Sequence, residues 1–92
     1  MSEPAIKKRL ARAKTSARGH YFNLKYTIIK TDDPVFCFIA MRRSEIRFVR
    51  VVIDRITDHD VKLVQGYEPP IVCAREIFCQ KETRFEIREV RE

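Results

Sequence analysis

The sequence predicts a single small α/β domain in which a central mixed sheet is flanked by helices, and three observations predict it. A length of 92 residues suits one domain with a thin core. Its 45% hydrophobic and 35% charged residues, with only two Gly and four Pro, are an ordinary globular composition. Segments with helical spacing alternate with short runs of β-forming residues, in the order α-β-β-β-α-β-β. Residues 1–92 are therefore interpreted as one domain, without a linker or an internal repeat.

A basic helix is expected over residues 1–19, with Ser2 as its N-cap and Gly19 as its stop. Its apolar side is a narrow stripe with helical spacing. The stripe is made up of Ile6, Leu10, Ala13 and Ala17. Because most of these side chains are small, we expect the helix to pack lightly.

Three strands are expected in the middle of the chain. Residues 21–30 are rich in aromatic and branched side chains and end at a turn. Residues 35–41 are apolar on both faces, as in a central strand, and residues 46–53 are apolar enough on both faces to be covered on both. The polar residues 42–45 between them are expected to form a short hairpin connection.

A short helix and a final hairpin complete the expected fold. Thr57 and Asp60 resemble a capping box with Asp in place of Glu, and they predict a helix that Gly66 ends. Residues 74–80 and 84–90 then fit two strands joined by a polar turn.

The net charge of +6 is distributed unevenly along the chain. Residues 1–30 hold eight Lys or Arg and one Glu, whereas the remaining 62 residues hold 11 basic and 12 acidic side chains. A localised basic surface attracts polyanions such as nucleic acid or an anionic membrane face. The alternative is a solvated helix face that binds nothing, because Lys and Arg are also good helix formers.

The candidate contacts to DNA or RNA are six cations of the first helix and two of the predicted hairpin connection. They are Lys7, Lys8, Arg9, Arg12, Lys14, Arg18, Arg42 and Arg43. Mixed Lys and Arg with few aromatic residues among them suit phosphate contacts rather than base reading. Tyr21 and Phe22 have rings that could stack on bases, but core packing explains them more simply.

The cysteines and histidines do not predict a metal or cofactor site. Cys73 and Cys79 have the wrong spacing for the usual zinc clusters, and Cys37 lies in an apolar run where a thiol behaves as a small hydrophobe. We therefore expect no metal and no cofactor. The longest apolar run has seven residues, too few to span a membrane, and the basic start is unlike a signal peptide. These features favour a protein of the reducing cytoplasm with no membrane partner.

Residues 34–57, PVFCFIAMRRSEIRFVRVVIDRIT, resemble the PD-(D/E)XK nuclease superfamily, which has the restriction-endonuclease and Holliday-junction-resolvase fold. In that family a hairpin carries Asp on its first strand and Glu-x-Lys on its second, and these residues bind a divalent cation and activate water. The resemblance implies an αβββαβ core of the restriction-endonuclease type. At the matching positions this chain has Cys37, Arg50 and Val52, so the resemblance implies a degenerate site without catalysis.

Three functions follow from these observations. The first is a non-catalytic nucleic-acid-binding module on a decayed nuclease-like fold. The second is a protein-interaction or assembly subunit, such as a homodimer, that uses an edge of the final hairpin. The third is a divalent-metal nuclease with displaced ligands, for which Asp33, Glu45 and Asp54 are the candidate carboxylates.

Overall fold

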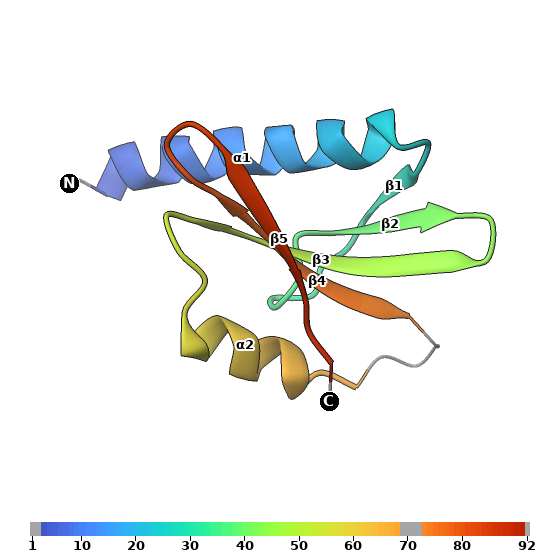
Figure 1. Ribbon diagram of the computed structural model, residues 1–92. Coiled ribbons are helices and arrows are strands. Elements are labelled where there is room, and N and C mark those ends of the chain that lie inside the picture. The colour runs from blue at the N-terminus through green and yellow to red at the C-terminus, as the bar shows by residue number, and fades with distance from the viewer. Residues whose placement is uncertain (1–2, 69–72, 92) are drawn as a thin grey trace.

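In the computed structural model, which describes residues 3–68 and 73–91, a mixed sheet lies between two helices (Figure 1). The elements of these residues follow the predicted order. They are α1 (Glu3–Asn23), β1 (Thr27–Lys30), β2 (Phe38–Arg42), β3 (Glu45–Ile53), α2 (Asp58–Gln65), β4 (Ala74–Gln80) and β5 (Phe85–Glu89). The prediction of an α/β fold with a central mixed sheet flanked by helices is confirmed.

The strands lie in the sheet in the order β1-β2-β3-β4-β5. β3 and β4 are parallel, and the other neighbouring pairs are antiparallel. A parallel pair needs a long crossover connection, which contains α2. α1 covers one face of the sheet and α2 the other (Figure 1). Neither of these described helices is long and apolar enough to cross a membrane.

Each face of the sheet has its own apolar cluster. The cluster under α1 has four large side chains that are at most 1% exposed, Tyr21, Phe38, Val49 and Phe78, and Tyr26 and Val51 are at most 5% exposed. The buried members of the cluster under α2 are Phe36, Phe48, Val64, Ile77 and Val90. Alternate residues of β3 join the two clusters, which confirms that both faces of this strand are covered.

The predicted end of the first helix is wrong. Gly19 has no positive φ, and α1 continues to Asn23. The reason is packing, because Tyr21 follows Ala17 by four residues and prolongs the buried stripe by one turn. Ser2, the predicted N-cap, lies outside the described residues.

α1 ends instead in a Schellman motif. Lys25 takes the left-handed position that glycine usually fills, with φ of 73°. The backbone N–H of Tyr26 donates to the carbonyl of Tyr21 over 3.0 Å, and the N–H of Lys25 donates to the carbonyl of Phe22 over 2.9 Å. The rings of Tyr21 and Tyr26 meet edge to face with centroids 5.7 Å apart, which supplies the apolar contact typical of this motif.

The first two strands are shorter than predicted. β1 takes only the last four of residues 21–30, because the first three are helical. β2 begins at Phe38 rather than at residue 35, because side chains hold the preceding segment as a loop. The carboxylate of Asp33 accepts a hydrogen bond from the backbone N–H of Val35 over 2.7 Å, and Arg50 donates to the carbonyl of Val35 over 2.8 Å.

The second half of the chain follows its prediction closely, since β3, β4 and β5 begin and end within one residue of the expected bounds. The capping box is present: Thr57 and Asp60 each accept the other's backbone N–H through their side chains. Gly66 caps the end of α2. The connection between β2 and β3 is shorter than predicted, because only Arg43 and Ser44 lie between the strands.

Candidate nucleic-acid interface

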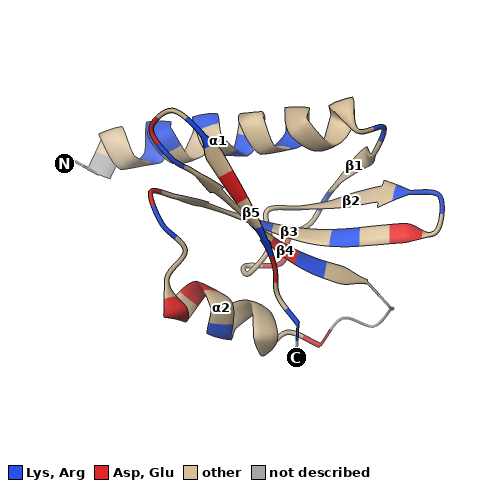
Figure 2. Cartoon of the chain, in the orientation of Figure 1, with Lys and Arg blue, Asp and Glu red and all other residues tan. Residues whose placement is uncertain are grey.

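α1 carries cations along its solvent side. With 3.6 residues per turn, Lys8 and Arg12 form one row, and Lys14 and Arg18 form another. Lys8, Arg12 and Arg18 are exposed, and Lys14 is half-buried. None of the four forms an ion pair with a carboxylate of the described residues. Figure 2 shows Lys and Arg along α1, whereas the Asp and Glu of the described residues, apart from Glu3 at the start of the helix, lie on the strands, the loops and α2.

Two of the eight predicted contacts make strong interactions inside the protein. Arg9 is hydrogen-bonded to Asp54, which follows β3, and this bond raises the pKa of Arg9. Arg42 donates to the carbonyl of Leu24 over 2.8 Å and lies over the ring of Tyr26. Both residues therefore hold α1 and its C-terminal turn to the sheet. From the sequence alone, both residues were expected to be surface cations.

A second group of cations lies at the C-terminal end of α1, where the tip of the β2–β3 hairpin meets the turn after the helix. The residues at this junction line an open hollow of about 650 Å³. Lys25 and Arg43 are exposed residues of the hollow, and Arg42 and Glu45 also line it. Lys25 was not among the predicted contacts, because its side chain belongs to a segment that was expected to be a strand.

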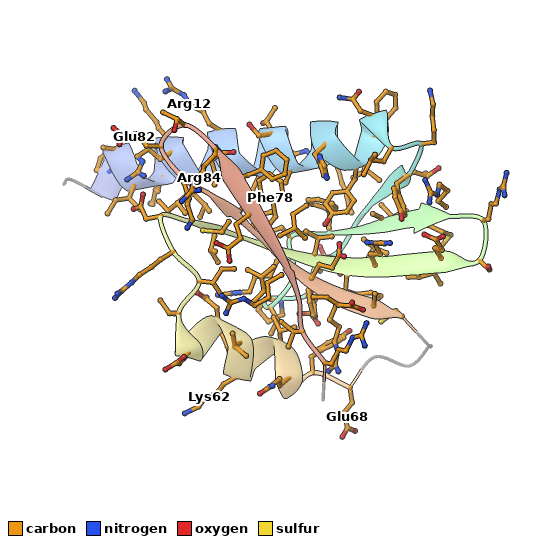
Figure 3. All side chains as sticks on the ribbon, viewed as in Figure 1. Arg12, Lys62, Glu68, Phe78, Glu82 and Arg84 are labelled. Carbon is orange, nitrogen blue, oxygen red and sulfur yellow. The ribbon has the colours of Figure 1, made fainter. Side chains whose placement is uncertain are left out.

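A groove at the other end of the molecule carries charges of both signs. It lies between α1 and the turn that joins β4 to β5, and its lining includes Arg12 and Glu82, which Figure 3 labels. Its charged lining residues are Arg9, Arg12, Asp54, Lys81 and Glu82. Since two carboxylates accompany three cations, the groove is less suited to a polyanion than the outer rows of α1.

Tyr21 and Phe22 are adjacent in the sequence, but their side chains differ in exposure. Tyr21 is 1% exposed in the cluster under α1, as core packing predicts. Phe22 is 69% exposed, so core packing is the wrong explanation for its ring.

A buried polar network under α1 was missed. Glu76 of β4 is 5% exposed, and its carboxylate accepts hydrogen bonds from the hydroxyl of Tyr21 over 2.5 Å and from Arg47 over 2.6 Å. Burial raises the pKa of Tyr21, and the bond to Glu76 raises it further. Tyr21 and Glu76 are 55 residues apart in sequence, so no local pattern could have paired them.

The structure does not bring together the three degenerate-site positions. Cys37 packs against the cluster under α1, whereas Val52 packs against the cluster under α2. Arg50 forms an ion pair with Asp60 of α2 over 3.1 Å. Burial acts to raise the pKa of Asp60, but hydrogen bonds from Thr57 and Arg50 outweigh it and hold this pKa below its usual value.

The candidate carboxylates of a displaced metal site are also apart. Asp33 accepts the backbone N–H of Val35, and Asp54 binds Arg9. Glu45 accepts the hydroxyl of Tyr26 over 2.7 Å, and this bond lowers the pKa of Glu45. Within residues 3–68 and 73–91, no three His, Cys, Asp or Glu side chains are grouped so that they could hold a metal ion.

Comparisons with protein-family models, with curated proteins and with solved structures found no match for this chain. The nuclease resemblance of residues 34–57 therefore stays a prediction.

Proposed function

We propose that this protein is a non-catalytic nucleic-acid-binding module that contacts the phosphates of DNA or RNA through α1. The observation that carries the proposal is the set of cations on the outer rows of this helix, Lys8, Arg12, Lys14 and Arg18, which pair with no carboxylate of the described chain. A polyanion supplies the missing counter-charges and releases its condensed counterions. Such contacts position the protein without reading sequence.

A decayed nuclease-like fold is part of the proposal. The order of α1 to β4 agrees with the αβββαβ core that the resemblance implies, and this agreement supports it. Cys37, Arg50 and Val52 carry sulfur, a guanidinium and hydrocarbon where the resemblance would place two carboxylates and a lysine, and these groups are unsuited to holding a divalent cation. Because Cys37 and Val52 pack on opposite faces of the sheet, the support for this fold comes from the element order and not from a common site. The free thiols fit a cytoplasmic location.

The salt dependence of binding tests the phosphate contacts. Fluorescence anisotropy with labelled duplex DNA, single-stranded DNA and RNA should detect binding at low salt. If four cations neutralise phosphates of a duplex, a fourfold rise in salt should lower the affinity roughly a hundredfold, because each contact contributes a slope of about −0.9. Binding to none of these nucleic acids, or binding that salt does not change, would contradict the proposal.

Paired variants place the contacts on α1. Lys8→Ala together with Arg12→Ala should reduce the salt slope by about two. The matched control removes two exposed cations elsewhere, Lys62→Ala with Arg91→Ala, and should leave the slope unchanged. Lys62 lies on α2, across the sheet from Arg12 (Figure 3). Equal losses from the two pairs would mean that only the overall charge matters and that α1 is not the interface.

Incubation of the nucleic acids with Mg²⁺ or Mn²⁺ tests whether the protein is non-catalytic. We expect no cleavage. Cleavage that Asp33→Ala or Glu45→Ala abolishes would establish a nuclease with displaced ligands instead.

An assembly role is the second candidate function, and the outer edge of β5 favours it. Among the described strands β5 pairs only with β4, so its other backbone edge is open, and Phe85 at its start is 46% exposed. Light scattering should then give a homodimer of twice 10.9 kDa. A strict monomer that purifies without another protein would exclude this candidate.

A further inference from the structure

Phe22 has a ring that the fold does not use. It is 69% exposed, more than the other large hydrophobic side chains found exposed in the described residues, of which Phe85 at 46% comes next. Phe85 stacks on Phe78 at a centroid distance of 4.9 Å, whereas no ring contact is found for Phe22 in residues 3–68 and 73–91. Packing explains Phe85, but it does not explain Phe22.

The position of Phe22 on α1 connects it to the proposed phosphate contacts. Lys14, Arg18 and Phe22 follow one another at intervals of four residues, so their side chains form one row along the helix surface. Arg18 also donates to the hydroxyl of Thr15 over 3.3 Å, which holds its guanidinium against the helix surface. Lys25 begins the hollow at the hairpin tip just beyond the end of α1. Along the chain, the exposed ring of Phe22 therefore follows Lys14 and Arg18 and precedes Lys25.

We infer that Phe22 is a stacking platform for an unpaired base and that the ligand of this surface is single-stranded nucleic acid. This inference rests on the proposed function and narrows its substrate class. In a duplex the faces of the bases are covered by their neighbours, so a protein ring on the outside of the helix reaches the backbone and the base edges in the grooves but no base face. In a single strand the bases can turn outward and stack on an aromatic ring while cations follow the phosphates.

Charge complementarity distinguishes this ligand from a protein partner. A protein partner would cover the ring of Phe22 together with apolar surface around it. Leu24, 45% exposed, is the one other exposed large hydrophobic residue within five positions of Phe22 among the described residues, and the row that contains Phe22 continues into Lys14 and Arg18. Cations next to an exposed ring form the kind of surface that single strands bind, since each nucleotide offers a phosphate and a base that can stack.

Substitutions at position 22 separate stacking from simple apolar contact. Phe22→Leu keeps an apolar side chain but removes the π face, so it should weaken binding of a labelled single strand about tenfold or more, whereas binding of a duplex of the same length should be unchanged. Phe22→Trp keeps a larger π face and should retain or increase the single-strand affinity. Phe85→Leu, which removes a half-exposed ring on β5, is the matched control and should leave binding unchanged.

The absence of tryptophan from the sequence gives a direct readout of stacking. Phe22→Trp introduces the sole indole of the chain, and its fluorescence should be quenched when a base stacks on it. Addition of a single strand should quench the emission in proportion to the anisotropy change, and addition of duplex should quench it much less.

The outcomes distinguish the inference from the proposed function. The inference is overturned if Phe22→Leu binds the single strand as tightly as the wild-type protein does. The phosphate interface stands in that case, provided that binding still depends on Lys8 and Arg12. A loss of duplex and single-strand binding by the same factor would also overturn it, because stacking should affect only the single strand. If no nucleic acid binds the unchanged protein, the proposed function itself fails.

Discussion

A methyl group at position 19 is expected to stabilise the protein. Gly19 lies inside α1 without a positive φ, and a Cβ built there meets no heavy atom within 4 Å. Glycine in a helix interior is about 1 kcal/mol less favourable than alanine. Gly19→Ala should therefore raise the free energy of unfolding by about that amount, as measured by urea titration. A loss of stability would mean that the helix stops at Gly19, as the sequence alone predicts.

Lys25 gives the complementary case, because its backbone has the left-handed conformation that disfavours a Cβ. Removal of the Cβ in Lys25→Gly should raise the free energy of unfolding by about 1 kcal/mol. Lys25→Ala is the control, since it removes the same charge and keeps the Cβ, and it should give no such gain. Equal stability of the two variants would show that the Schellman motif does not strain this residue.

Asp60 connects the start of α2 to β3. Its carboxylate accepts hydrogen bonds from Thr57 and from Arg50, whose side chain is only 20% exposed. Asp60→Ala removes the capping box and leaves the guanidinium without its carboxylate, so it should lower the free energy of unfolding by about 1–3 kcal/mol at pH 7.

The effect of Asp60→Ala should depend on pH. The folded-state pKa of Asp60 is below its usual value, because hydrogen bonds to the carboxylate outweigh the opposing effect of burial. Its stabilising contribution is therefore present above the unfolded-state pKa of about 3.9, and it is lost as the pH falls through the folded-state value. The difference between the variant and the unchanged protein should shrink below about pH 4. An equal difference at pH 7 and in acid would contradict this assignment.

At the scale of elements, the hydrogen bond between Tyr21 and Glu76 attaches the C-terminal half of α1 to the middle of the sheet. The bonded carboxylate is 5% exposed, so loss of its donor leaves a buried charge with fewer partners. Tyr21→Phe should lower the free energy of unfolding by about 1.5–3 kcal/mol. Tyr26→Phe is the matched control and should cost less, because its hydroxyl binds Glu45, whose side chain is 48% exposed.

The elements that local patterns predict well are those whose causes are local. β3 follows from its own apolar faces, and α2 from a capping box that spans only Thr57 to Asp60. The end of α1 was mispredicted because residues 21–30 were assigned to a strand, although Tyr21 continues the buried stripe of the helix and its hydroxyl bonds a residue 55 positions away. Distant contacts also limit the prediction of the candidate interface. Arg9 was predicted as a phosphate contact with the other cations, but it binds Asp54, 45 residues later, and so holds α1 to the sheet.

At the scale of the whole molecule, most of the net charge of +6 lies on one covering helix, since α1 holds six Lys or Arg and one Glu. Lys14 and Arg18 are like charges four residues apart, an arrangement that costs a helix about 0.2–0.5 kcal/mol. Their row lies along α1 with no ion-paired carboxylate from the described residues to offset the repulsion. A bound polyanion would supply the missing counter-charges and remove this repulsion.

Salt should therefore act in opposite directions on stability and on binding. A rise from about 0.01 to 0.15 M shortens the Debye length from about 30 to 8 Å, which weakens the repulsion along α1 and should raise the free energy of unfolding. The same rise should lower the affinity for a labelled oligonucleotide. Urea titrations and anisotropy at matched salt concentrations measure the two trends, and Lys14→Gln with Arg18→Gln should flatten both. If the free energy of unfolding instead falls with salt, attraction within ion pairs such as Arg47–Glu76 outweighs the repulsion along α1. A polyanion would then gain nothing from relieving charge repulsion in the free protein.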